Sequence, residues 1–134
     1  MKYKLIQRGN PSNPAAPKKW YASPQTQGTV SLDALATEIS GRSSLTRGDV
    51  KSVLENLVDL MPQKLADGWS IKLGGLGTFR ASFSSSGSDT PEEFNAAQIR
   101  GTKVLFTSGK AIKTGLEDIS FEREAGDNTQ PARR

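Results

Sequence analysis

The chain has 134 residues and a mass of 14.4 kDa, which suits one domain of ordinary size but not two well-buried ones. Hydrophobic residues make up 34% of it, and 18 Lys and Arg residues against 14 Asp and Glu residues leave a formal net charge of +4. Cysteine and histidine are absent, which excludes disulfide frameworks, thiolate nucleophiles, histidine-metal sites and Ser-His-Asp triads. Carboxylate pairs, lysine and metal held by carboxylates remain for catalysis, but the Asp and Glu residues of the helices show no paired arrangement. We therefore expect no enzyme, no metal site and no cofactor.

The sequence also lacks the features of a membrane or nucleotide-binding protein. No apolar run approaches the roughly 20 residues of a membrane span, and the first residues lack the apolar centre of a signal peptide. No glycine-rich phosphate loop with the spacing of a nucleotide site is present. We expect a soluble cytoplasmic protein with no membrane partner and no small-molecule substrate.

The excess positive charge lies in the first 30 residues, which contain no acidic residue. Prolines exclude a helix there, and two short stretches with aromatic or branched residues, 3–7 and 19–22, flank them. An edge hairpin with a long loop and a flexible arm both agree with this pattern. The basic residues of this segment are Lys2, Lys4, Arg8, Lys18 and Lys19.

Two helices are predicted next. Ser31 can cap a first helix, whose apolar residues over 32–39 recur at the helical spacing. Thr46 and Asp49 predict a capping box at the start of a second, longer helix with a broad apolar stripe. Pro62 interrupts that stripe, which predicts a kink or a restart at this point.

The hydrophobic period then changes from helical to two. Residues 69–73 and 78–83 alternate apolar with polar side chains on either side of a glycine-rich turn, which predicts a β-hairpin. A third strand is predicted over 102–106, and a short last helix is expected to begin with Ser108 as its cap. The order of elements is therefore two helices, a hairpin, a long two-stranded projection and a short helix.

Two motifs stand in this order at a characteristic distance. They are Leu-Gly-Gly-Leu-Gly-Thr-Phe at 73–79 and Val-Leu-Phe-Thr-Ser-Gly-Lys-Ala-Ile-Lys at 104–113. With them, residues 30–119 resemble the bacterial HU/IHF histone-like DNA-binding proteins. The basic proline-rich extension over 1–29 resembles the HU-related branch of Bacteroides-type bacteria, and 120–134 are expected to form a polar, disordered tail.

The resemblance implies an HU/IHF-like α+β fold. Its elements would be two N-terminal helices, a three-stranded antiparallel sheet with a projecting β-arm, and a short C-terminal helix, in an intertwined homodimer. The apolar stripe of the second helix is too broad for the rest of one chain to cover, which agrees with a second copy.

The function that the resemblance implies is architectural. The homodimer would bind double-stranded DNA with low sequence specificity through phosphate contacts, as a cytoplasmic, nucleoid-associated protein. The alternative is an HU-fold dimerisation or scaffold module that has lost DNA bending. An enzyme is the third reading, and the missing histidine and cysteine argue against it.

The expected DNA-binding residues are placed by the same motif match. Lys110 and Lys113 match the family's lysines at the start of the last helix, where helix amides and lysines form a phosphate site. Other cations are expected on the saddle and the bases of the arm. The complete set is Lys72, Arg80, Arg100, Lys103, Lys110 and Lys113.

The arm departs from the family pattern. It is shorter, lacks the Arg-Asn-Pro tip and carries Pro91 near the position of the intercalating wedge. Asp89, Glu92 and Glu93 beside it would repel phosphates. Pro91 is thus either a possible arm wedge or a proline that starts a short helical turn.

Aromatic residues beside the basic ones also have two interpretations. Trp69 is expected either in the core or dimer packing or as a stacking platform for a base. Trp20 and Tyr21 stand next to Lys18 and Lys19, so they could contact nucleic acid or pack as part of a strand.

Overall fold

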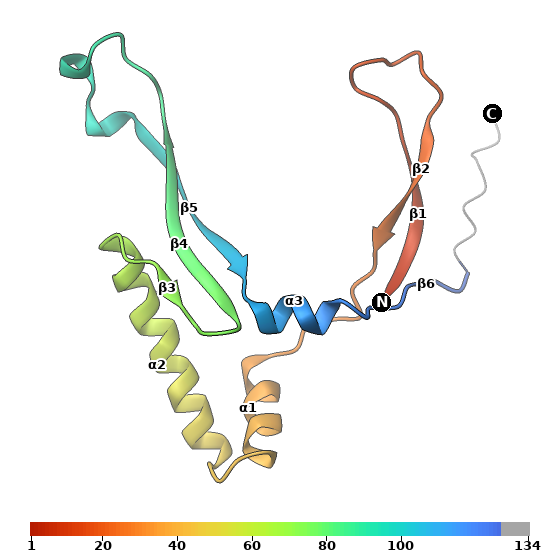
Figure 1. Cartoon of the computed structure of the whole chain (residues 1–134), viewed down its shortest axis with the longest axis vertical. Helices are drawn as coiled ribbons and strands as arrows, with labels where there is room; N and C mark the ends of the chain where they lie inside the picture. Colours follow the sequence, from red (N-terminus) through yellow and green to blue (C-terminus); the bar gives the residue numbers. More distant parts are fainter. Residues whose placement is uncertain (127–134) are drawn as a thin grey trace. The chain divides into compact units, whose positions relative to one another are not determined.

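The computed structural model describes residues 1–126, which fall into two compact units. One unit joins Met1–Thr29 to the chain from Asp118 onward, and the other comprises Val30–Glu117. Figure 1 shows the elements of each unit, coloured by their position along the sequence. The larger unit carries the helices and the arm, and each unit is described by itself below.

The N-terminal unit is a three-stranded sheet in the order β2-β1-β6. β1 (Lys2–Arg8) and β2 (Lys19–Pro24) form an antiparallel hairpin (Figure 1), which decides between the two alternatives for this segment in favour of the hairpin. β6 (Glu122–Arg123) pairs parallel to the start of β1. The expectation of a disordered tail over 120–134 is therefore wrong for these two residues, and its part beyond residue 126 lies outside the described residues.

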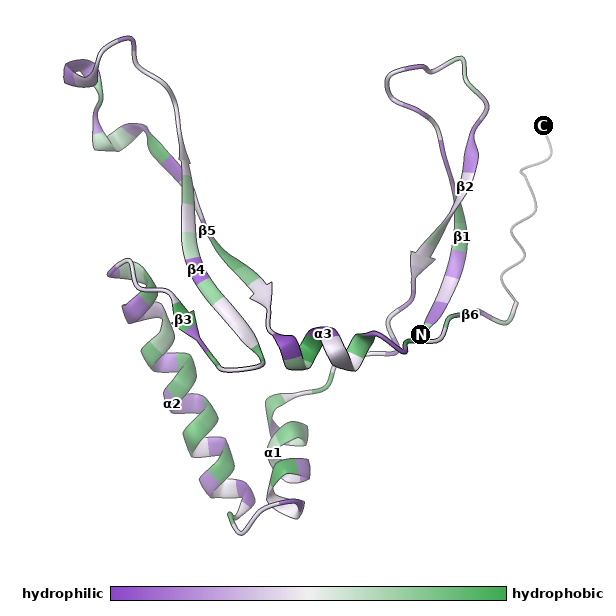
Figure 2. Ribbon diagram, viewed as in Figure 1, coloured by the Kyte–Doolittle hydropathy of each residue, from purple (hydrophilic) through white to green (hydrophobic). Residues whose placement is uncertain are grey.

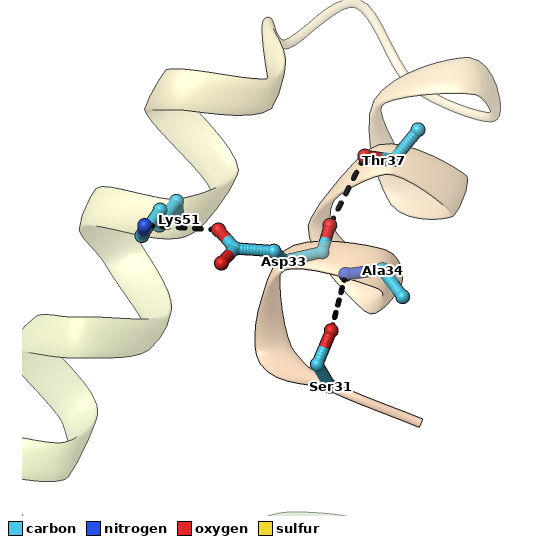
Figure 3. Close-up of polar contacts among 5 residues, drawn as sticks. All are labelled: Ser31, Asp33, Ala34, Thr37 and Lys51. Carbon is cyan, nitrogen blue, oxygen red and sulfur yellow. Dashed lines mark hydrogen bonds and ion pairs between the residues drawn. The ribbon is translucent and has the colours of Figure 1, made fainter. Parts of the chain in front are cut away.

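Both predicted helices are present and begin at the predicted capping residues. α1 (Leu32–Gly41) follows Ser31, whose hydroxyl oxygen accepts a hydrogen bond of 3.1 Å from the backbone three residues on (Figure 3). α2 (Arg47–Ala66) follows Thr46, whose side chain accepts from the Asp49 backbone N–H at 3.1 Å. The Asp49 carboxylate accepts from the Thr46 backbone N–H, also at 3.1 Å, so the capping box is complete.

α2 runs through Pro62 as one helix, so the alternative of a restart at that position is wrong. A proline inside a helix removes one backbone hydrogen bond, and its ring clashes with the carbonyl four residues back. The residues around it keep the helix packed, because Met61 is half-buried and Leu65 is buried. Tertiary packing of one face supplies most of the stability of a helix, and it offsets the missing hydrogen bond here.

An ion pair connects the two helices. The Lys51 Nζ lies 2.9 Å from the Asp33 Oδ1 (Figure 3). The hydrogen bond from Lys51 and then its charge hold the pKa of Asp33 below its ordinary value, and the same contact raises the pKa of Lys51. Each helix also buries a side chain, Ala36 in α1 and Val50 in α2.

The predicted antiparallel sheet has the order β3-β4-β5. β3 (Ile71–Lys72) is short, whereas β4 (Gly77–Ser85) and β5 (Ile99–Ser108) continue beyond it as the arm (Figure 1). α3 (Lys110–Leu116) follows with Gly109 as its N-cap. The prediction of Ser108 as the cap is wrong, because Ser108 is still the last residue of β5 and pairs with β4.

The core of one chain is small. Among residues 1–126, the buried hydrophobic side chains are Ala36, Val50 and Leu65, with exposed fractions of 0%, 4% and 8%. Hydrophobic residues recur along α1, α2 and the arm strands (Figure 2). Many of them are exposed, including Val53 at 62% and Trp69 at 65%, so Trp69 is not in the core of a single chain.

Candidate nucleic-acid interface

The β3-β4-β5 sheet has one apolar face. Cross-strand partners lie on the same face of a sheet, and residues two apart along a strand share that face. Phe79 pairs with Ile71 on one side and with Phe106 on the other. The Phe79 and Phe106 rings are tilted by 37° with centroids 4.8 Å apart, and the neighbouring pair Ala81 and Val104 extends this face along the arm.

The opposite face carries the predicted cations. Lys72 pairs with Thr78, and Arg80 lies two residues further along the same strand. Lys103 pairs with Ser82, which continues the same alternation. We call this the basic face of the sheet, and the structure brings together on it Lys72, Arg80, Arg100 and Lys103.

A β-bulge is what places Arg100 on the basic face. The register shifts between Ser82 and Ser84, so that Ser82 pairs with Lys103 and Ser84 pairs with Arg100. Two steps along β4 thus oppose three steps along β5, and the extra residue lies at Gly101, whose φ is +67°. A glycine in the left-handed region is typical of one bulge type. Without the bulge, Arg100 and Lys103 would point to opposite faces.

The turn before β4 packs tightly against the start of α3. The Gly109 N–H donates to the Leu76 carbonyl at 2.9 Å, and the Ala111 N–H donates to the Gly75 carbonyl at 3.1 Å. A Cβ at Gly109 would lie 2.9 Å from the Gly77 nitrogen, and a Cβ at Gly75 would lie 2.9 Å from the Ala111 Cβ. The glycines of both motifs therefore allow two backbone segments to meet.

Beside this contact lies a surface hollow of about 510 Å³, and four of its lining residues are glycines. Lys72 from the sheet and Lys110 from α3 both line it, together with hydroxyl side chains. Lys113 lies one turn further along α3 and does not line the hollow. The complete lining is Lys72, Gly74, Gly75, Gly77, Thr78, Thr107, Ser108, Gly109 and Lys110.

The predicted cations are available to an anionic partner. All six are exposed, and within residues 1–126 none of them forms an ion pair with a carboxylate. The ion pair between Asp33 and Lys51 lies on the helices instead. The positive charge of the basic face is thus not neutralised inside the described part of the chain.

The tip of the arm is folded on itself and acidic. Pro91 starts a single 3-10 turn (Pro91–Glu93), which is the geometry of the second interpretation given to this residue. The Asn95 N–H donates to the Gln98 Oε1 at 2.7 Å, and the Gln98 amide donates to the Ser86 hydroxyl at 3.3 Å across the tip. Carboxylates of Glu92 and Glu93 stand directly beside Pro91.

Sequence reasoning missed the residues that orient the cations. Gly101 and Gly109 carry no charge, so a search for DNA-binding residues passes over them. Gly101 interrupts an otherwise regular strand pattern, and an isolated glycine in a strand is a signal for a bulge.

Other kinds of site find no support in the described residues. Within 1–126, no three metal-ligating side chains gather in one place. Nor does that part of the chain include a helix with the length and hydrophobicity needed to cross a bilayer.

Comparison with known proteins finds relatives among the HU proteins. The family model described as HU domain fused to wHTH, Ig, or Glycine-rich motif matches residues 1–123. The DNA-binding protein HU of Buchnera aphidicola from Acyrthosiphon pisum is 33% identical over 87 residues, covering 63% of this chain and 95% of the relative. The DNA-binding protein HU of Buchnera aphidicola from Baizongia pistaciae is 34% identical over 83 residues, covering 60% of this chain and 90% of the relative.

Two solved structures share the fold. A protein from Bacteroides vulgatus, described as a bacterial DNA binding protein, aligns with a TM-score of 0.63 at 17% identity over 91% of this chain. The chain spans 47% of the length of that protein. Anabaena HU, crystallised with DNA, aligns with a TM-score of 0.52 at 15% identity, over 67% of this chain and 100% of the Anabaena chain.

Proposed function

The chain belongs to the family of HU domains fused to wHTH, Ig or glycine-rich motifs, and from this premise we propose that it is an architectural protein that binds double-stranded DNA. The observation that carries the proposal is the basic face, on which four exposed cations from three strands point the same way. Lysine and arginine contacts to phosphate hold a duplex without reading its sequence. We therefore propose a low sequence specificity, and we infer the nucleoid of the cytoplasm as the place of binding.

The hollow at the start of α3 is the proposed phosphate site of the body. Lys72 and Lys110 line it from two elements, which the close packing of the glycine turn against the start of α3 brings together. Lys113 adds a positive charge one turn along the helix. This arrangement supports phosphate contacts by Lys110 and Lys113, with the sheet cations following the backbone on either side.

A homodimer is part of the same proposal. A domain of this size needs a larger core than the three buried side chains that residues 1–126 provide. α2 and the apolar face of the sheet both keep exposed apolar residues, and a second copy of the chain would cover them. Val53 and Leu60 lie seven residues apart on one side of α2, and both are more than half exposed.

The arm tip favours a second candidate function, a dimerisation or scaffold module of the HU fold that does not bend DNA. An intercalating wedge needs an apolar side chain that can approach the base stack. Pro91 starts a 3-10 turn with carboxylates on both following residues, which phosphates would repel. A bending assay on duplex DNA separates the two functions, because a scaffold leaves the shape of the duplex unchanged.

Titration of duplex affinity with salt tests the proposed function. If phosphate contacts dominate binding, the logarithm of the association constant falls linearly with the logarithm of the salt concentration. The slope of this line, the salt slope, is about −0.9 for each phosphate contact. Duplexes of unrelated sequence should give the same affinity and the same slope. No binding at about 50 mM salt, or a slope near zero, would refute DNA binding through these cations.

A further inference from the structure

A like-charged pair lies at one end of the N-terminal hairpin. Arg8 and Lys19 are direct cross-strand partners, and Ile6 pairs with Tyr21 two residues away on the same face. Like charges placed directly opposite each other destabilise a sheet. Within residues 1–126 neither cation has a carboxylate partner, so the described structure offers nothing that offsets the repulsion.

The loop of the hairpin shapes a hollow against this pair. Arg8, Lys19 and Tyr21 line a surface hollow of about 450 Å³, and the rest of its lining comes from the connecting loop, including Pro11 and Pro17. The loop is ordered by Asn10, whose side chain accepts from the Ser12 N–H at 2.9 Å. The cations are thus presented on a structured surface, and Tyr21 remains 48% exposed beside them.

The charge of the same face is positive along the length of β1. Lys2 and Lys4 share the face of Arg8 and Lys19, because every second residue of β1 points to the same side, and both lysines are exposed. Glu122 is in register with Lys2, at the end of β1 remote from Arg8. The positive potential is therefore strongest at the Arg8 and Lys19 end, where an anion would relieve the repulsion.

We propose that this face of the hairpin is a second DNA-contacting surface, which binds phosphates of a duplex between Arg8 and Lys19. The proposal rests on the proposed function, since it assigns the hairpin to the same ligand as the basic face of the sheet. A two-stranded ribbon with cations on alternate residues suits a duplex backbone, because i and i+2 side chains project on one side. Two linked surfaces raise the affinity of the chain by effective concentration.

The test uses the full chain with Arg8→Gln and Lys19→Gln combined. The matched control is Arg47→Gln with Lys64→Gln, which removes the same charge from exposed positions of α2. The expected result is duplex binding on the order of ten-fold weaker at about 50 mM salt, with the magnitude of the salt slope reduced by about two. The control pair should change both quantities much less.

Thermal unfolding of each variant shows whether weaker binding comes from a lost contact or from a folding defect. If Arg8 and Lys19 serve to bind an anion, replacing them removes a repulsion from the fold. The hairpin variant should then unfold at the same or a higher temperature than the wild type, while it binds DNA more weakly. Wild-type binding with no difference between the hairpin and control variants would overturn the second surface alone. A loss seen with single-stranded DNA but not with duplex would also overturn it, whereas no binding by the wild type would refute the proposed function itself.

Discussion

Arg100 and Lys103 lie on the same face of the arm although they are three positions apart, because the bulge at Gly101 adds one residue to β5. In a regular strand, residues three apart point to opposite faces. The two cations therefore depend on a glycine with φ of +67° for their common direction. A residue without charge thus determines the electrostatic character of the arm.

Replacing Gly101 should damage both stability and binding. In Gly101→Val, a branched side chain would be forced into the left-handed region, at a cost of about 1–2 kcal/mol in the free energy of unfolding. If the bulge is lost instead, Arg100 turns to the apolar face, and the magnitude of the salt slope decreases by about one per chain. Urea unfolding and salt titration measure the two effects.

Two further variants control for the Gly101 substitution. Gly101→Asn should retain most of the stability and binding, because asparagine adopts the left-handed conformation more readily than other residues. Gly87→Ala, at an open position of the same arm, should change neither property. Equal effects of Gly101→Val and Gly87→Ala would show that the bulge does not orient Arg100.

Neutralising the lysines of α3 should weaken binding to all sequences alike. Lys110→Gln with Lys113→Gln removes two proposed phosphate contacts, so the magnitude of the salt slope should fall by about two per chain. The measurement is a salt titration on several duplexes of unrelated sequence. Arg47→Gln with Lys64→Gln on α2 is the control, and a loss confined to one duplex sequence would contradict phosphate binding.

The dimer is testable on the exposed side of α2. Val53→Asp changes a side chain that is 62% exposed in one chain, where a surface substitution alters stability by about 0.5 kcal/mol or less. In a dimer it would bury an unpaired carboxylate and cause dissociation. Sedimentation equilibrium should show twice the chain mass for the wild type and for the control Ser52→Asp, which lies on the polar face. Equal masses for all three proteins would argue against this interface.

Local signals predicted most of the fold. Ser31, Thr46 and Asp49 define helix starts because capping depends on backbone donors within one turn, and the alternation after Gly68 identifies the strands. The cap of α3 could not be predicted in the same way. Ser108 is a good capping residue by propensity, but its pairing in β5 takes precedence.

The arrangement of the site was harder to predict because it depends on register. The motifs identified the lysines of α3, whereas the common face of Arg100 and Lys103 follows from one bulged residue. Likewise, composition shows that the N-terminal segment is basic, but only the hairpin register places Arg8 opposite Lys19. A shift of one residue in either hairpin would have reversed these faces.

The capping box of α2 should make stability depend on pH in the acid range. Hydrogen bonds from Thr46, first from its side chain and then from its backbone, hold the pKa of Asp49 below its ordinary value. A lowered pKa contributes stability that is complete above the unfolded-state pKa of about 3.9 and is lost as the pH falls through the folded value. Asp49→Asn keeps an acceptor but does not titrate, so its unfolding free energy should fall less between about pH 5 and about pH 3. An identical fall in Asp49→Asn and wild type would contradict this assignment.

The acidic tip of the arm should oppose DNA binding. Glu92→Gln with Glu93→Gln removes two carboxylates beside Pro91, and affinity for duplex DNA should rise about five-fold at low salt, because repulsion between like charges is weakly screened there. Glu55→Gln with Asp59→Asn on α2 makes the same change in net charge away from the arm. A larger rise for the tip pair than for the α2 pair places the tip near the phosphates. Equal rises would mean that net charge alone matters and that the tip does not reach the duplex, as expected for a scaffold module.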